Sequence, residues 1–212
     1  MSMKTSRYLL LTLLVSLIAG IDVFAQTSSK ELTTNILDKA ASQLRKEGGV
    51  TVGFTISNAN GSDKGTLDML GKKFHSVMEG LETWYDGKSM WSYVPANEEV
   101  NLTKPKASEL AKVNPYYFLD IYKKGNKLTK GNNTNSYYEV VMNSLNPKSS
   151  ISKAVIRVDR QTYHIKYIKV TNAKNIWLEI NVTSYKKGQK FPAGTFAFNK
   201  AKHPNADVID LR

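Results

Sequence analysis

Residues 65–100 read GTLDMLGKKFHSVMEGLETWYDGKSMWSYVPANEEV, a stretch in which strand-forming runs alternate with turns. The pair Asp86-Gly87 is a strong hairpin signal, because a type I′ turn needs a positive φ at both central residues. Large aromatic side chains flank this turn, with Trp84-Tyr85 before it and Trp91 and Tyr93 after it. The stretch therefore predicts consecutive antiparallel strands that carry bulky apolar side chains.

Strand patterns continue on both sides of this stretch. Residues Val50–Ile56 alternate apolar and polar side chains, which is typical of a half-buried strand. We expect a loop over Gly125–Asn135 and a turn over Lys186–Lys190. The whole pattern predicts a single antiparallel meander of about ten or eleven strands, and a sheet of that size must curl to bury one face. The further strands are expected at Thr66–Leu70, Lys73–Met78, Glu98–Leu102, Ser136–Asn143, Ile151–Asp159, His164–Thr171 and Ile176–Tyr185.

Two regions have a helical pattern instead. Residues Ser28–Lys46 place apolar side chains at helical spacing, and Gly48-Gly49 ends the pattern. In the middle of the chain, Lys106–Val113 and Pro115–Lys124 are expected to be short helices, since proline suits the first turn of a helix. The sequence thus predicts one N-terminal helix and a central helical insertion between two sets of strands.

The N-terminus has the pattern of a secretory signal peptide. Lys4 and Arg7 precede an apolar run over Tyr8–Ala19, and Val23-Phe24-Ala25 is a small-x-small cleavage site. The run is shorter than the roughly 20 residues that span a bilayer. We expect cleavage near Ala25, so that residues 1–25 are a signal peptide and 26–212 form a single exported domain. The chain has no cysteine, which excludes thiol chemistry and lipid attachment to a cysteine.

The chain is basic, with a formal net charge of +12. Such a charge favours anionic partners, which include nucleic acid, lipid headgroups and acidic proteins. An exported protein is not expected to meet nucleic acid, and the lysine pairs are spread along the chain as on a solvated surface. We therefore expect no nucleic-acid partner.

The sequence lacks the residue patterns of common catalytic sites. Its three histidines, His75, His164 and His203, have no neighbour at metal-ligand spacing. No G-x-S-x-G elbow and no glycine-rich phosphate loop occurs. We expect no catalytic residues, no metal, no cofactor and no enzymatic activity.

Three motifs give the chain a family resemblance. The first is the strand that ends in Trp84-Tyr85, followed by Asp86-Gly87-Lys88 and then W-x-Y-x-P; the second is the run NPYYFL over residues 114–119. The third is the C-terminal segment 196–212. In spacing and order these motifs resemble the LolA family of periplasmic lipoprotein carriers, and in particular its Bacteroidetes-type branch.

The resemblance implies a fold and a function. The fold would be mostly β with helices (α+β), a curled antiparallel half-open β-barrel with an N-terminal helix and a central helical lid over an apolar cavity. The protein would be a monomeric periplasmic chaperone that carries lipoproteins from the inner to the outer membrane by binding their acyl chains. Its partners would be acylated lipoproteins and an inner-membrane lipoprotein-release ABC transporter, while an outer-membrane acceptor stays open. The alternative is an envelope lipid-binding sensor or glycolipid-binding protein of the same fold.

Composition and the family resemblance predict different roles for the apolar side chains. Composition alone favours a filled core, whereas the resemblance favours a cavity, for which methionine and aromatic side chains are well suited. The family's enterobacterial branch ties its lid to the barrel with an arginine, and Gly71-Lys72-Lys73-Phe74 offers none. The lid is expected to include Tyr117, Phe118 and Ile121. The expected lining of the lipid-binding cavity is Phe54, Leu67, Met69, Phe74, Trp91, Tyr93, Leu178 and Ile180.

Overall fold

The computed structural model describes residues 30–212, except 107–108, 111–113, 118 and 120–121. The expected signal peptide lies outside these residues and stays a prediction, as does a single domain over 26–212. Within the described residues, no helix combines the length and the apolar composition needed to cross a membrane.

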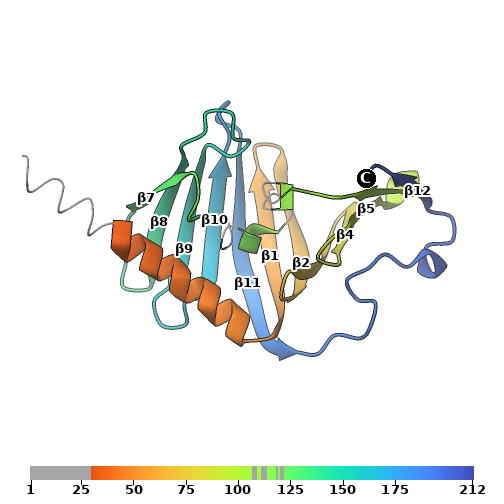
Figure 1. The fold of residues 1–212 in the computed structure, drawn as a ribbon, viewed down its shortest axis with the longest axis horizontal. Coiled ribbons are helices and arrows are strands. Elements are labelled where there is room, and N and C mark those ends of the chain that lie inside the picture. The colour runs from red at the N-terminus through yellow and green to blue at the C-terminus, as the bar shows by residue number, and fades with distance from the viewer. Residues whose placement is uncertain (1–29, 107–108, 111–113, 118, 120–121) are drawn as a thin grey trace, which may run out of the picture.

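The residues that the structure describes build one sheet of 12 strands, with the helix over residues 30–46 lying across it (Figure 1). The strands follow the order β12-β6-β5-β4-β3-β2-β1-β11-β10-β9-β8-β7. The prediction of a mostly β fold with an N-terminal helix is thereby confirmed. The strands are β1 (Gly49–Asn58), β2 (Gly61–Leu70), β3 (Lys73–Met78), β4 (Leu81–Tyr85), β5 (Met90–Val94), β6 (Glu99–Thr103), β7 (Asn126–Lys130), β8 (Tyr137–Ser144), β9 (Lys153–Asp159), β10 (Ile165–Thr171), β11 (Trp177–Gln189) and β12 (Asp207–Asp210).

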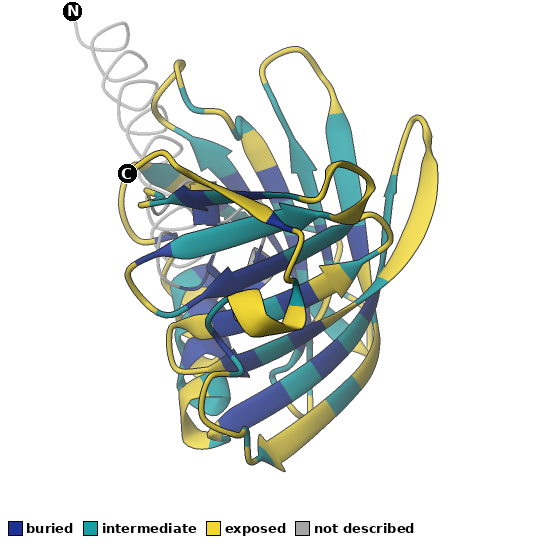
Figure 2. Cartoon of the chain, turned by 90° about the vertical axis from the view of Figure 1, so that its right-hand side faces the viewer, coloured by how far each residue is buried: buried dark blue, intermediate teal, exposed yellow. Residues whose placement is uncertain are grey.

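The sheet curves strongly, but it does not close into a barrel (Figures 1 and 2). Its two edges are β12 and β7, which have a partner on one side only. The expectation of a purely antiparallel meander is also wrong at one edge, because β12 pairs with β6 in parallel, with Asp207 opposite Glu99. The C-terminal segment reaches this position after leaving β11, so the last strand does not neighbour the one before it in the chain.

The two edge strands are the ones that sequence patterns did not indicate. β7 falls in the expected loop, and its residues NKLTK include one apolar side chain, Leu128. An edge strand buries little of itself, so it needs no apolar alternation. β11 is also longer than expected: it continues through Lys186 and Lys187 to Gln189, which pairs with Gly49 of β1.

The hairpin at Asp86-Gly87 forms as expected, but its turn is of another kind. β4 ends at Tyr85 and β5 begins at Met90, so the loop has four residues rather than two. Gly87 alone takes a positive φ, of 100°. The carboxylate of Asp86 accepts hydrogen bonds from the main-chain N–H groups of Lys88 and Ser89, and this side-chain cap replaces the type I′ turn.

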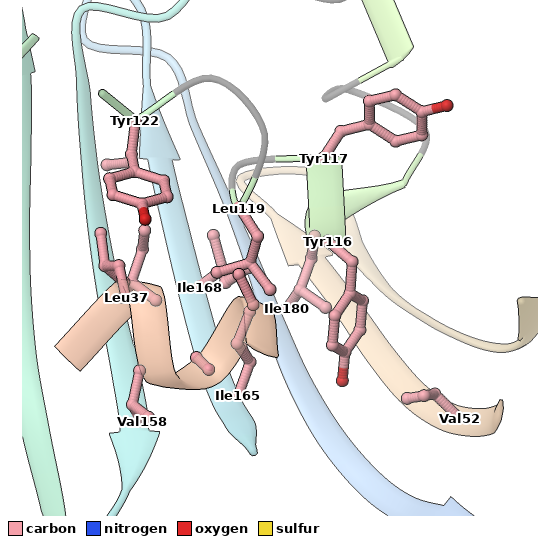
Figure 3. Packing of buried hydrophobic residues seen from close by; sticks show 14 of the residues in the cluster. Leu37, Val52, Tyr116, Tyr117, Leu119, Tyr122, Val158, Ile165, Ile168 and Ile180 are labelled. Atoms are coloured by element: carbon pink, nitrogen blue, oxygen red, sulfur yellow. The ribbon is translucent and has the colours of Figure 1, made fainter. Parts of the chain in front are cut away.

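The helix over residues 30–46 packs on the concave face of the sheet. Its buried stripe includes Ile36, Leu37, Ala40 and Ala41, all with less than 5% of their surface exposed. Figure 3 shows Leu37 between the strands below it and Tyr122 of the β6–β7 connection above it. Because these side chains recur every three to four residues, they form one apolar stripe that faces the sheet.

The strands divide their side chains between two apolar layers. The concave face carries the main core, in which Val52, Leu67, Phe74 and Ile168 are almost fully buried. On the opposite, convex face, Trp84 and Val100 are buried outside that core. They lie under the C-terminal segment, and the rings of Trp84 and His203 are 5.7 Å apart between centroids. This second layer explains why the C-terminal segment stays on the sheet.

Candidate functional site

The connection between β6 and β7, here called the central segment (residues 104–125), crosses the concave face. β6 lies near one edge of the sheet and β7 forms the other edge, so the chain must pass over the strands between them (Figure 1). Its described side chains Leu110, Tyr116, Leu119 and Tyr122 are all buried in the main core. The central segment is therefore a cover over the concave face.

Two sets of contacts fix the central segment. The Tyr117 hydroxyl donates a hydrogen bond of 3.1 Å to the main-chain carbonyl of Lys72, in the turn between β2 and β3. At its other end, Tyr122 hydrogen-bonds the carboxylate of Asp38 on the helix, and Lys123 Nζ lies 2.6 Å from the same carboxylate. Burial by itself would raise the pKa of Asp38, but the hydrogen bonds from Lys123 and Tyr122 outweigh it, so this pKa lies below its ordinary value.

A cavity of about 330 Å³ lies between the C-terminal end of the helix, the β2–β3 turn and the central segment. We call it the helix-end cavity. Its mouth carries Arg45 and Lys72, both exposed, and no carboxylate is among its described lining residues. Its volume is at the lower end of the range of small-molecule sites. Its lining is Ala41, Leu44, Arg45, Gly48, Met69, Leu70, Gly71, Lys72, Asn114, Tyr116, Tyr117 and Leu119.

One residue that lines this cavity, Tyr116, carries a hydroxyl that is buried out of reach of the cavity space and has no partner among the described residues. Leaving such a group unpaired costs about 1–3 kcal/mol. Burial, together with the nearby charge of Glu47, raises the pKa of Tyr116, so this hydroxyl keeps its proton.

A second cavity, of about 490 Å³, lies at the opposite end of the strands. We call it the loop-end cavity, because the β1–β2, β8–β9 and β10–β11 loops surround it. No charged side chain is among its described lining residues. Its lining is Asn58, Ala59, Asn60, Ser150, Ile151, Val170, Thr171, Asn172, Ile176, Trp177, Leu178 and Ile180.

The residues that were expected to line one cavity or its lid lie at different places in the structure. Met69 and Tyr117 line the helix-end cavity, and Leu178 and Ile180 line the loop-end cavity. Other expected lining residues belong to the main core of the concave face. They are Phe54, Leu67 and Phe74, each with 7% or less of its surface exposed.

Trp91 and Tyr93 lie on the other face of the sheet. In β5, Met90 pairs with Tyr85 of the main core, whereas Trp91 pairs with Trp84. Adjacent residues of a strand point to opposite faces, so Trp91 joins the convex layer. Tyr93 does the same, with its ring 4.8 Å from that of His203. Phe118 and Ile121, the other expected lid residues, lie outside the described residues, and a helical lid stays a prediction.

Sequence reasoning missed several lining residues. Leu44 belongs to the apolar stripe of the helix and could have been found from its spacing. Tyr116 stands next to Tyr117 in the motif NPYYFL, but a repeat of two tyrosines does not tell which faces a cavity. The sequence places Ile151 and Ile176 at the starts of expected strands, whereas β9 begins at Lys153 and β11 at Trp177 in the structure. Ile176 alternates with Leu178 and Ile180, so it could have been found from that spacing.

A buried carboxylate holds the end of the helix on the sheet. Glu47 accepts a hydrogen bond from the Tyr185 hydroxyl at 2.6 Å, and its Oε1 lies 2.7 Å from Nε2 of His164. The side chain of Glu47 is only 4% exposed. Burial by itself would raise the pKa of Glu47, but the hydrogen bonds from Tyr185, His164 and Gln43 outweigh it, so the pKa is lowered. This cluster fixes one wall of the helix-end cavity.

The other two histidines also have structural partners. His75 Nε2 lies 2.7 Å from Glu82, and His203 packs among Trp84, Tyr93 and Phe198. Among the described residues, no group of three or more histidine, aspartate or glutamate side chains is arranged to hold a metal ion. The site is therefore characterised by apolar volume under a cover.

Comparison with known proteins gives the family. The model of the family described as outer membrane lipoprotein carrier protein LolA matches residues 21–174. The chain belongs to this family. Membership of the Bacteroidetes-type branch stays a prediction. No curated protein is similar enough to the chain to count as a match.

Solved structures share the fold at low sequence identity. A conserved protein from Thermus thermophilus matches with a TM-score of 0.60 and 11% identity, over 84% of this chain and 98% of that one. A domain described as a putative outer membrane lipoprotein-sorting protein, from Vibrio parahaemolyticus, has a TM-score of 0.42 and 13% identity, over 78% and 97%. A LolA superfamily protein from Nitrosomonas europaea has a TM-score of 0.43 and 9% identity, over 78% and 97%.

Proposed function

We propose that the protein is a periplasmic carrier that binds the acyl chains of lipoproteins on its concave face and takes them from the inner to the outer membrane. The observation that carries the proposal is the helix-end cavity, an apolar space under a cover that has polar contacts at Lys72 and Asp38. Membership of the LolA family supports it, since lipid and lipoprotein binding fit that family.

The energetics explain why such a carrier needs a covered apolar face. Each methylene group that is moved out of water contributes about 0.8 kcal/mol, so an acyl chain cannot cross an aqueous compartment exposed. The carrier must also release the chain. A cover held by contacts at Lys72 and Asp38 can open, and a ligand shifts that equilibrium by binding the open state more tightly.

The helix-end cavity offers more than apolar surface. Its exposed Arg45 and Lys72 are donors for which the ester carbonyl of an acyl chain is a suitable acceptor. The loop-end cavity, lined by Leu178 and Ile180, would take further chain length once the central segment moves.

The test is release of a newly matured lipoprotein from inner-membrane vesicles by protein purified from the envelope of expressing cells. Carrier function predicts a soluble complex of one lipoprotein with one carrier. Free lipid or glycolipid in the purified protein, without lipoprotein release, would instead favour the sensor or glycolipid-binding function. No release and no lipid would contradict both.

Two variants localise the site. Leu70, 42% exposed, lines the helix-end cavity, and Val77, 40% exposed, lies on the neighbouring strand β3 outside both cavities. We expect Leu70→Glu to abolish loading because it places a carboxylate at the entrance of an apolar cavity, and Val77→Glu to leave loading intact. Equal effects of the two variants would show that the helix-end cavity does not bind the acyl chains.

A further inference from the structure

Two large apolar side chains protrude at one end of the sheet. Leu145, which follows β8, is 67% exposed, and Ile176, which precedes β11, is 63% exposed. Both belong to loops at the upper end of the strands in Figure 1. We call the β8–β9 loop (residues 145–152) and the β10–β11 turn (residues 172–176) the loop rim.

Strand order places these two side chains at the same end of the sheet, three strand spacings apart. β8, β9, β10 and β11 are consecutive in the sheet, and neighbouring strands lie about 4.8 Å apart. Ile151, from the same end of the sheet, lies between them and lines the loop-end cavity together with Ile176. The loop rim therefore presents two protruding apolar groups at one end of the sheet, and one of them, Ile176, lines an apolar cavity.

The loops hold these side chains outward through their own hydrogen bonds. Asn172 Oδ1 accepts from the main-chain N–H groups of Lys174 and Ile176 at 2.9 and 3.0 Å. In the other loop, the main-chain N–H of Leu145 donates to the carbonyl of Gly125 at 2.8 Å. The exposure of Leu145 and Ile176 is thus built into ordered turns.

The charge of the loop rim has one sign. Lys148 and Lys174 are both exposed, and the two loops contain no aspartate or glutamate. The remaining residues are mostly asparagine, serine, alanine and proline. Lysine side chains beside protruding apolar groups are the combination that binds the interface of an anionic bilayer, where the apolar groups reach the acyl chains and the cations contact the headgroups.

We propose that the loop rim docks the protein on the surface of an anionic phospholipid membrane. A protein partner would need a contiguous surface of about 800 Å² on this side, whereas the loop rim offers separate protruding side chains with polar residues between them. Docking in this orientation brings the loop-end cavity against the lipid. The docking surface is independent of the cargo that the protein carries.

The test is co-sedimentation of the purified protein with lipid vesicles that contain no lipoprotein. We expect binding to vesicles of phosphatidylcholine mixed with phosphatidylglycerol, and much weaker binding to phosphatidylcholine alone. Replacing Leu145 and Ile176 together by serine should weaken binding about tenfold or more, since each side chain buries apolar surface in the bilayer. The matched control is Leu211→Ser, which should bind as the unchanged protein does. Leu211 is 60% exposed and follows β12, the edge strand at the other end of the strand order from β7.

Two further measurements distinguish the contribution of the lysine charges from that of apolar insertion into the bilayer. Lys148→Gln and Lys174→Gln should each weaken binding to anionic vesicles about fivefold at low salt. The emission of Trp177, which stands next to Ile176 and lines the loop-end cavity, should shift to the blue on binding, and Trp177→Phe should lose that shift. Absence of binding to anionic vesicles, or a loss caused by the lysine variants but not by the Leu145/Ile176 double variant, would overturn the proposal.

Discussion

The hydroxyl of Tyr117 donates a hydrogen bond of 3.1 Å to the main-chain carbonyl of Lys72. The contact joins the central segment to the β2–β3 turn, in the stretch Gly71-Lys72-Lys73-Phe74 that contains no arginine. The ring of Tyr117 also lies edge-on to Phe74 and Tyr85, with centroids 6.3 and 6.2 Å apart. Tyr117 therefore attaches the central segment to the sheet through both a polar and an apolar contact.

Replacement of Tyr117 by phenylalanine tests the contribution of its hydrogen bond to Lys72. The ring contacts remain, and the hydrogen bond, worth about 0.5–1.5 kcal/mol, is lost. We expect the main-chain amides around residue 117 to exchange hydrogen faster while global stability changes little, as measured by exchange and mass spectrometry. Tyr93→Phe, on the convex face, is the control. Unchanged exchange in Tyr117→Phe would show that the hydrogen bond does not hold the central segment.

The Glu47 cluster should make stability depend on pH. Burial would raise the folded-state pKa of Glu47, but hydrogen bonds from Tyr185, His164 and Gln43 outweigh it and lower this pKa below its ordinary value. Its charged form therefore contributes stability that is present above the unfolded pKa, about 4.3. That contribution is lost as the pH falls through the lower folded-state pKa.

We expect Glu47→Gln to lower the free energy of unfolding at pH 7 by about 1–3 kcal/mol. The difference between variant and unchanged protein should shrink below about pH 4.3, as urea unfolding curves at a series of pH values would show. Glu179→Gln removes a partly exposed ion pair with Lys169 and should cost about 1 kcal/mol or less. A difference for Glu47→Gln that does not change with pH would contradict the role assigned to its charge.

Much of the fold could be predicted from alternation of apolar residues, and the failures have physical causes. β12 pairs with β6 in parallel, far along the chain, and no local pattern marks such a pairing. Trp91 was expected at the cavity because it is large and apolar. It faces the C-terminal segment instead, and a second apolar layer on the convex face cannot be inferred while the path of that segment is unknown.

Strand register is the second limit on what the sequence could predict. The position of each side chain on one face or the other depends on strand pairing, and a shift by one residue moves a strand's whole apolar set to the opposite face. Phe54, Leu67 and Met69 lie together in the main core, on strands that clear alternation marks. Cavity-lining residues in loops, such as Ile151, have no such marker.

Gly65 is required by close packing on the concave face. A Cβ at this position would lie 2.5 Å from the ring of Phe54 and 2.8 Å from the carbonyl of Val77. We expect Gly65→Ala to destabilise the protein by about 1–3 kcal/mol, measured by urea unfolding. Thr66→Ala, a change at the exposed next residue, should stay within about 0.5 kcal/mol. Equal stability of the two variants would show that Phe54 moves aside at no cost.

Substitutions at two adjacent residues of β5 test which face of the sheet binds the cargo. Met90 pairs with Tyr85 and packs against the main core, and Trp91 pairs with Trp84 in the convex layer. A glutamate at position 90 would place a charge under the cover, whereas a glutamate at position 91 would place it on the side of the C-terminal segment. Both side chains are half-buried, so the two substitutions make similar demands on folding.

We expect Met90→Glu to lower loading with lipoprotein, and Trp91→Glu to leave it unchanged. Circular dichroism and the unfolding midpoint of each variant would first establish that both are folded. Loading is then measured by release of lipoprotein from inner-membrane vesicles. The reverse result, a loss in Trp91→Glu alone, would place the cargo on the convex face, because the pairing of β4 with β5 leaves no other way for position 91 to contact it.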